Sequence, residues 1–295
     1  MSALNAILLG LIQGIAEFLP ISSSGHLSVV QNVLAELGVI QFQGAEEGHL
    51  FFDVLLHLGT LASVCVFFRK DIKGIVLELA SIIRNIIGTI TGKRDKAARA
   101  EANRMPKTPA RRMLVMVIIG TLPLLVVLPI KGYVEELYYN TRFIGIAFLL
   151  TGAMLFVSDK LAQGTRNFKT MTGTNALTIG ISQAIAVIPG LSRSGTTITA
   201  GLANGLDRDT AVRYSFLMSL PAVLGATLLE LIDAFQEGLQ WGLLPVYLLG
   251  MVVAAFVGYI AIGLVRVIVN KGKFGYFAYY CLVIGVLTVI VSFII

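Results

Sequence analysis

Apolar residues run in long stretches along the chain, and polar residues gather in short segments between them. Six of these stretches approach the ~20 residues of helix that a bilayer core requires, although the third is short. They cover residues 49–68, 113–130, 143–158, 212–232, 243–264 and 275–295. The pattern predicts an all-α polytopic membrane protein with six transmembrane helices, built as a single integral membrane domain over residues 1–295.

Two further apolar stretches, 4–34 and 174–206, are broken at their centres by Pro, Ser and Gly. Irregular backbone at membrane depth is tolerated only where protein or a water-filled cavity satisfies its polar groups. We therefore predict two re-entrant helical hairpins, each of which enters and leaves on one side of the membrane. Residues 74–90 carry charges within an apolar pattern, which predicts an interfacial helix.

The two broken stretches are related in sequence. At an offset of 170, LIQGIAEFLPISSSGH at 11–26 aligns with ISQAIAVIPGLSRSGT at 181–196, with six identities in sixteen positions. Two breaks rich in Ser and Gly can look alike by composition, but the shared Gln-x-Ile-Ala upstream argues against that alternative. We predict an inverted-topology repeat, with repeat 1 at about 1–130 and repeat 2 at about 143–295, whose broken helices meet near the midplane.

Composition and charge placement agree with a membrane protein. Apolar residues make up 56% of the chain and charged residues 14%, and the mean hydropathy is +0.83. Residues 69–112 hold twelve of the 23 Lys and Arg, whereas residues 1–68 hold none. A nucleic-acid-binding arm would also be basic, but basic segments between apolar spans are typical of cytoplasmic loops. We therefore place the basic loop at about 91–112 inside and segments 27–48 and 233–242 outside, and expect no nucleic-acid partner.

With these sides, the first hairpin enters from outside, and its break carries candidate chemistry. Gln13 and Glu17 lie four residues apart on one helical face, and a carboxylate inside a membrane usually faces a cavity and a partner. The hydroxyls of the break can cap a half-helix from about 26 to 35, whose N-terminus would seat a phosphate. The alternative is a purely structural one, in which buried Glu17 holds two helices together and His26 has no functional role. The candidates after Glu17 are Ser22, Ser23, Ser24, Gly25 and His26.

The second hairpin contributes a cation. Arg193 is the only Lys or Arg within 170–207, and its planar fork of donors suits phosphate or carboxylate oxygens. A purely structural ion pair between Arg193 and Glu17 is the alternative. The neighbouring candidates for substrate binding are Ser192, Ser194, Gly195, Thr196 and Thr197.

The sequence does not decide the roles of some other polar residues. Asp53 and His57 share a face of the first span, where they would contact the cavity, bind a metal or bond to each other. Tyr138 falls near a span end, as residues of the interfacial aromatic belt do.

At this point the residues resemble a known family. QGIAEFLPISSSGH at 13–26 and PGLSRSGTT at 189–197 resemble the two signature motifs of the undecaprenyl-diphosphate phosphatase family (BacA/UppP), which is linked to bacitracin resistance. FFDVLLHLGTLASV at 51–64 and YSFLMSLPAVLGA at 214–226 resemble further family segments. The resemblance implies a phosphatase that converts undecaprenyl diphosphate to undecaprenyl phosphate and so recycles the lipid carrier of cell-wall precursors.

The resemblance also implies a setting and site roles. It implies a multi-pass protein of the cell (plasma) membrane, a site that faces the outer side, a divalent cation (Mg or Ca) with Glu17 as a ligand, and a homodimer. Gln13 stands where the family's first carboxylate lies, which leaves one metal ligand fewer, and many members have Gln at His57. The implied catalytic residues are Glu17, Ser23, His26 and Arg193, with Thr197 as the motif threonine. Ser23, His26 and water all remain possible nucleophiles.

Two rivals belong to other classes. Inverted repeats with half-helices at the midplane also suit a transporter or flippase of polyprenyl phosphate, and a small-anion channel would use Arg193 as its filter charge. A resemblance to another group of lipid phosphatases fails at two positions. Ser24, Gly25 and His26 resemble the first motif of PAP2-type lipid phosphatases, but Thr199 and Ala203 replace the His and Asp of the second.

Overall fold

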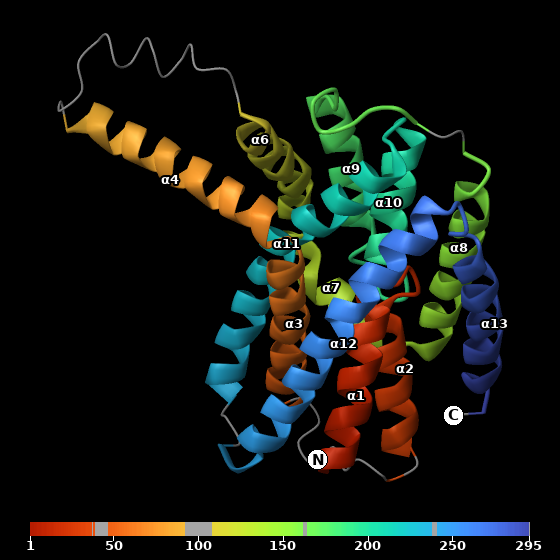
Figure 1. Cartoon of the computed structure of the whole chain (residues 1–295). Coiled ribbons are helices and arrows are strands. Elements are labelled where there is room, and N and C mark those ends of the chain that lie inside the picture. The colour runs from red at the N-terminus through yellow and green to blue at the C-terminus, as the bar shows by residue number, and fades with distance from the viewer. Residues whose placement is uncertain (37, 39–46, 92–107, 162–163, 238–240, 295) are drawn as a thin grey trace.

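The computed structural model describes the chain except residues 37, 39–46, 92–107, 162–163, 238–240 and 295 (Figure 1). The described part is helical, with one isolated bridge between Arg166 and Leu206, so the predicted all-α class is confirmed. The basic segment 91–112 lies mostly outside the described residues. The α-helices are α1 (Ala3–Ala16), α2 (Ser23–Glu36), α3 (Glu47–Phe67), α4 (Arg69–Ile90), α6 (Pro109–Thr121), α7 (Lys131–Glu136), α8 (Thr141–Ser158), α9 (Gly173–Ile185), α10 (Arg193–Ala203), α11 (Arg208–Glu237), α12 (Leu244–Asn270) and α13 (Tyr276–Val291).

Four helical segments of the described chain are long and apolar enough to span a bilayer. They are Pro109–Val134, Thr141–Ser158, Arg208–Ile232 and Trp241–Asn270, which match four of the six predicted spans. The predicted span at 49–68 is α3, which meets this criterion only together with α4, across a bend of 91°. The predicted span at 275–295 is α13, an apolar helix of 16 residues.

The helix predicted at 74–90 begins earlier than expected. α4 starts at Arg69, directly after α3, and only Phe68 separates the two helices. Phe68 is buried in the main core, so this packing holds the bend between α3 and α4 in place. Many apolar side chains of α4 are exposed, including Leu77 and Ile86, as an interfacial helix requires. The location of α4 at the membrane surface stays a prediction.

The two broken stretches each fold into a pair of helices. α1 and α2 lie in the lower half of Figure 1, and α9 and α10 lie in its upper half. The two pairs contact each other at their breaks, because the hydroxyl of Ser194 in the first turn of α10 donates to the carbonyl oxygen of Leu19, between α1 and α2, at 3.2 Å. A Cβ on Gly25 would meet Gly190 Cα at 3.0 Å and the Phe148 ring at 2.7 Å, so the two hairpins approach closely.

Both hairpins restart their helices in the same way. Ser22 Oγ accepts from the Gly25 amide at 3.3 Å, and Ser192 Oγ accepts from the Gly195 amide at 3.1 Å. In each hairpin this hydroxyl also lies 3.3 Å from the hydroxyl two residues later. The predicted capping is therefore present, but α2 begins at Ser23 and not near residue 26.

The first break turns at a serine and not at a glycine. Ser22 has φ +70°, the only positive value outside glycine in the described chain, whereas Gly25 lies inside α2. In the second hairpin Gly190 takes the left-handed conformation, with φ +88°. The first break thus keeps a strained backbone at a serine that also caps the helix.

Close packing fixes α3 beside the hairpins. α12 packs along both α1 and α3. A Cβ on Gly59 of α3 would overlap the Met251 carbonyl of α12, and the Ser63 hydroxyl donates to the Ala255 carbonyl at 2.6 Å. This packing holds the polar face of α3 against the end of α1.

Candidate active site

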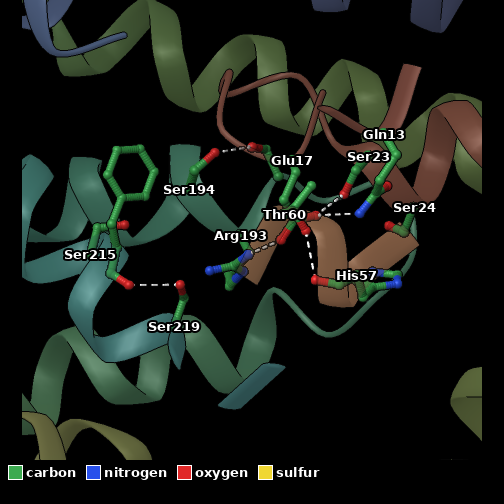
Figure 2. Close-up of polar contacts among 12 residues, drawn as sticks. Gln13, Glu17, Ser23, Ser24, His57, Thr60, Arg193, Ser194, Ser215 and Ser219 are labelled. Carbon is green, nitrogen blue, oxygen red and sulfur yellow. Dashed lines mark hydrogen bonds and ion pairs between the residues drawn. The ribbon is translucent and has the colours of Figure 1, made fainter. Parts of the chain in front are cut away.

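Glu17 stands at the centre of the polar cluster where the hairpins meet (Figure 2). It follows the last residue of α1, and its side chain is 6% exposed. One carboxylate oxygen pairs with Arg193 Nη2. The other accepts from Ser23 Oγ at 2.7 Å and from Gln13 Nε2 at 3.2 Å. Three donors therefore stabilise this carboxylate in a region with little water.

Arg193 comes from the other hairpin. It is the first residue of α10, and its side chain is 19% exposed. A buried guanidinium without an anion would be very unfavourable, and Glu17 supplies the anion. The structure thus brings together Gln13, Glu17 and Ser23 of the first break and Arg193 of the second, which is the composite arrangement that the sequence indicated.

Ser23 has the geometry of an activated hydroxyl. It opens α2, and its 2.7 Å hydrogen bond to Glu17 joins a hydroxyl to a carboxylate that can take its proton. The hydroxyl of the next residue, Ser24, lies 3.3 Å from the Ser22 hydroxyl, and Tyr138 lies beside it. Ser23 therefore differs from its neighbours in its direct contact with the acidic group.

The hydroxyls of the second hairpin mostly serve the fold. Ser192 caps α10, and Ser194 donates to Leu19 across the hairpin contact. Thr197 Oγ1 donates to the Arg193 carbonyl at 2.8 Å and lies 2.6 Å from Ser215 Oγ of α11. These contacts fix the start of α10, and with it Arg193. Thr196 differs, because its hydroxyl is buried without a partner in the described chain.

His26 does not join the Glu17–Arg193 cluster. Its Nδ1 donates to the Ser22 carbonyl at 2.7 Å, and its Nε2 accepts from the Tyr280 hydroxyl at 2.8 Å. The ring packs against Phe148 of α8 and stacks on Tyr280 of α13. Both ring nitrogens of His26 are thus engaged outside the Glu17–Arg193 pair in this conformation, and its catalytic role stays a prediction.

Asp53, His57 and Tyr138 lie near the Glu17 cluster. His57 Nδ1 donates to the Asp53 backbone carbonyl at 2.9 Å, and His57 interacts electrostatically with Glu17. Tyr138 lies near Ser24 and within electrostatic range of Glu17, which the expected place in an aromatic belt does not require. The sequence around Tyr138 carries no signal for this, because only the fold brings residues 137–139 to α2.

The described residues do not fit a resident divalent cation. They contain no group of three His, Cys, Asp or Glu side chains that could hold a metal ion. Glu17, the expected ligand, already receives three donors, one of which is the cationic Arg193. Gln13 Oε1 is buried without a partner, but one amide oxygen is a weak basis for binding Mg²⁺ or Ca²⁺.

Comparisons with known proteins agree with the motifs. The family model of the bacitracin resistance protein BacA matches residues 6–287 of this chain. A protein of Methanosphaera stadtmanae named undecaprenyl-diphosphatase is 39% identical over 294 residues, which cover 98% of each chain. Proteins with the same name from Desulforapulum autotrophicum and Halothermothrix orenii are 38% and 35% identical, over 100% and 99% of each chain. The chain therefore belongs to the bacitracin resistance protein BacA family.

Proposed function

We propose that this protein hydrolyses undecaprenyl diphosphate to undecaprenyl phosphate and inorganic phosphate, and so recycles the lipid carrier of cell-wall precursors. The names of its relatives support this activity. The observation that carries the proposal is the meeting of Ser23, Glu17 and Arg193 between two hairpins of a strongly apolar chain. These residues supply a nucleophile, a base and an anion-binding cation within one buried cluster.

The substrate diphosphate would enter the cluster by competing with the Glu17 carboxylate for Arg193. A phosphate group offers the guanidinium two oxygens in the geometry that its fork prefers. α2 begins at Ser23 and α10 begins at Arg193, so both helix N-termini lie at this cluster, where the helix dipole favours negative charge. Once Arg193 turns to the phosphate, Glu17 loses its ion pair, keeps the hydrogen bonds from Gln13 and Ser23, and becomes better able to accept a proton. Substrate binding would thereby prepare the base.

The chemical step then follows from the Ser23–Glu17 hydrogen bond. As Glu17 takes the hydroxyl proton, Ser23 Oγ forms a bond to the terminal phosphorus, and the bond from that phosphorus to the bridging oxygen breaks. Undecaprenyl phosphate leaves, and Arg193 stabilises the charge that develops on the phosphoryl oxygens. Water then attacks the phosphorus of the phosphoserine, and the bond from that phosphorus to Ser23 Oγ breaks. Glu17 returns its proton to Ser23 Oγ, and inorganic phosphate leaves with the oxygen and protons of the water. Direct attack by water, with Ser23 only orienting it, is the alternative route.

His26 receives a positioning role in this scheme. Its bonds to the Ser22 carbonyl and to Tyr280 tie the strained turn before Ser23 to α13. We derive no step through a divalent cation, because the described residues do not fit one. Retained activity in excess chelator is the result that this scheme expects.

We also infer the finer architecture of six spans and two re-entrant hairpins in an inverted repeat. The matching caps at Ser22 and Ser192 and the opposed hairpins of Figure 1 support it. In the plasma membrane, the basic residues would keep the ends of α9 and α10 inside, so that the first hairpin and its site open to the outer side. A homodimer stays an expectation from the family resemblance.

The decisive experiment is phosphate release from undecaprenyl diphosphate by purified protein in detergent. We expect release by the native chain and a loss of at least about 100-fold in Arg193→Ala and Glu17→Ala, because each removes a group that acts on the reacting phosphoryl. Size-exclusion profiles and helix content check folding. Near-native release by either folded variant would refute the assignment. A pure flippase would release no phosphate, because detergent removes the two sides between which it works.

A further inference from the structure

A cavity lies where α8 ends and α13 begins, two helices that pack along each other (Figure 1). Asp159 directly follows α8, and its carboxylate accepts from the Phe274 amide at 3.1 Å and from the Gly275 amide at 2.6 Å. The cavity beside this tie has a volume of about 330 Å³, within the range of small-molecule sites. Its lining includes two lysines and three aromatic rings, namely Lys160, Lys273, Phe156, Tyr276 and Tyr279.

The lining of this cavity carries unpaired positive charge. Lys160 Nζ lies 4.7 Å from the centre of the Phe156 ring, and Lys273 Nζ lies 5.7 Å from the centre of the Tyr276 ring, so aromatic faces hold both ammonium groups there. Neither lysine forms an ion pair with a carboxylate in the described part of the chain. Asp159 also lines the cavity, but its carboxylate already receives two backbone amides.

A third cation stands directly behind the cavity. Gly272, another lining residue, has a φ of +68°, and a Cβ there would meet Arg208 Nη1 at 2.9 Å. Arg208 Nη1 donates to the Val269 carbonyl at 2.9 Å, and Arg208 has no ion pair with a carboxylate among the described residues. Three positive groups therefore stand against the single charge of Asp159, a balance that favours an anion.

The cavity continues into an apolar strip on the surface of the bundle. Phe156 and Tyr279 pack edge to face, with 6.3 Å between their ring centres, and both rings are exposed. Tyr279, Val283 and Leu287 are spaced by four residues along α13, and all three are exposed. Tyrosines near the end of a span lie at the headgroup level of a bilayer, so the strip beyond them would meet acyl chains.

We propose that this cavity binds the phosphate of an anionic glycerophospholipid of the surrounding membrane. Lys160 and Lys273 donate to the phosphate oxygens, and an acyl chain follows the strip of Tyr279, Val283 and Leu287. The positive charge selects an anionic lipid over a zwitterionic one, and the strip selects a lipid phosphate over a free phosphate. The bound lipid would bridge α8 and α13 beside the tie that Asp159 makes.

Native mass spectrometry of the purified protein in detergent measures this binding, with phosphatidylglycerol as the probe and phosphatidylcholine as the zwitterionic comparison. Each lysine contact with an anionic lipid contributes about fivefold in affinity, so Lys160→Gln/Lys273→Gln should bind phosphatidylglycerol about 25-fold more weakly than native protein. Lys73→Gln/Lys271→Gln removes the same charge from exposed positions outside the cavity and should keep the native affinity. Equal losses in the two double variants, or equal native affinity for the two lipids, would overturn the proposal.

A fluorescent probe shows whether the lipid lies in this cavity. Trp241 is the one tryptophan of the chain, so Tyr276→Trp in a Trp241→Phe background places a single indole at the lining and keeps an aromatic face for Lys273. In phosphatidylcholine vesicles, a minor fraction of phosphatidylglycerol with brominated acyl chains should quench this indole more than the same fraction of brominated phosphatidylcholine. Lys160→Gln/Lys273→Gln should lose the difference, with an unchanged size-exclusion profile and helix content.

Competitors then distinguish the possible sources of the phosphate. Unbrominated phosphatidylglycerol should relieve the quenching, and excess inorganic phosphate should leave it unchanged. Relief by inorganic phosphate would indicate a site for free anions and would overturn the assignment to a lipid. Relief by undecaprenyl phosphate at lower concentrations than by phosphatidylglycerol would indicate a polyprenyl lipid and would overturn the assignment to a glycerophospholipid.

Discussion

Among single residues, Ser23 and Ser24 are chemically identical neighbours with different surroundings. Ser23 donates to the Glu17 carboxylate at 2.7 Å, whereas the Ser24 hydroxyl lies 3.3 Å from the Ser22 hydroxyl. A hydroxyl becomes a useful nucleophile only when a base can take its proton as it attacks. The environment therefore selects Ser23 as the reactive hydroxyl of the pair, and the two serines form a matched test.

We expect Ser23→Ala to lose at least about 1,000-fold in phosphate release, and Ser24→Ala to lose no more than about tenfold. If Ser23 is the nucleophile, brief reaction with substrate labelled in the terminal phosphate leaves label on the native protein and none on Ser23→Ala. Acid quench and mass spectrometry of the peptide locate the phosphoserine. Label on Ser24 would contradict the assignment, and the absence of label with full activity would favour direct attack by water.

Some of this site could be predicted from the sequence, for a physical reason. A buried Arg193 and a buried Glu17 each need an opposite charge, so their pairing follows once the two breaks are taken as one centre. The direction of His26 could not be predicted, because Tyr280 and Phe148 decide it from more than 100 positions away. The same holds for Tyr138, whose distance in sequence from Ser24 hides their proximity.

At the scale of elements, the start of α2 decides where the reactive group stands. Ser22 caps this helix through the Gly25 amide, although its own φ of +70° is unfavourable for a residue with a side chain. The sequence predicted a cap and a break here. It did not predict a left-handed serine, because glycine is the usual residue for that conformation and Gly25 lies only three positions away. Gly25 is required inside α2 instead, because Phe148 and Gly190 pack too closely against it to leave room for a Cβ.

Substitutions at Ser22 should separate the cap from the backbone strain. Ser22→Ala removes the cap and keeps the left-handed conformation, so we expect it to destabilise the hairpin by about 1 kcal/mol or more. Ser22→Asn should retain stability, because Asn both caps helices and tolerates positive φ. The measurement is the midpoint of thermal unfolding in detergent. Ser192→Ala is the matched control for loss of a cap alone, and equal midpoints for Ser22→Ala and native protein would contradict this account.

The whole molecule shows an asymmetry between its two ends. The start of α4, with Arg69 and Lys70, marks the basic end of the molecule. Near this end, Arg213 pairs with Asp71 at 2.8 Å and with Asp209 at 3.7 Å, and Arg266 pairs with Asp209 at 2.7 Å. These partly exposed pairs contribute little stability singly, but together they tie α4, α11 and α12 at one end. The first hairpin, with Glu17 and Ser23, has its chain ends toward the opposite side (Figure 1). The access from the outer side that we propose would leave these ties intact.

This orientation can be measured with single cysteines. With Cys65 and Cys281 replaced by Ser, a cysteine is placed at Tyr133, which is 74% exposed before α8, or at Lys169, which is exposed before α9. Because basic loops stay inside, a membrane-impermeant maleimide on intact cells should label Tyr133→Cys, and label Lys169→Cys only after permeabilisation. Phosphate release by each variant confirms that it is folded. The reverse labelling pattern would place the basic end and the ends of α9 and α10 outside, so the first hairpin and its site would open inward.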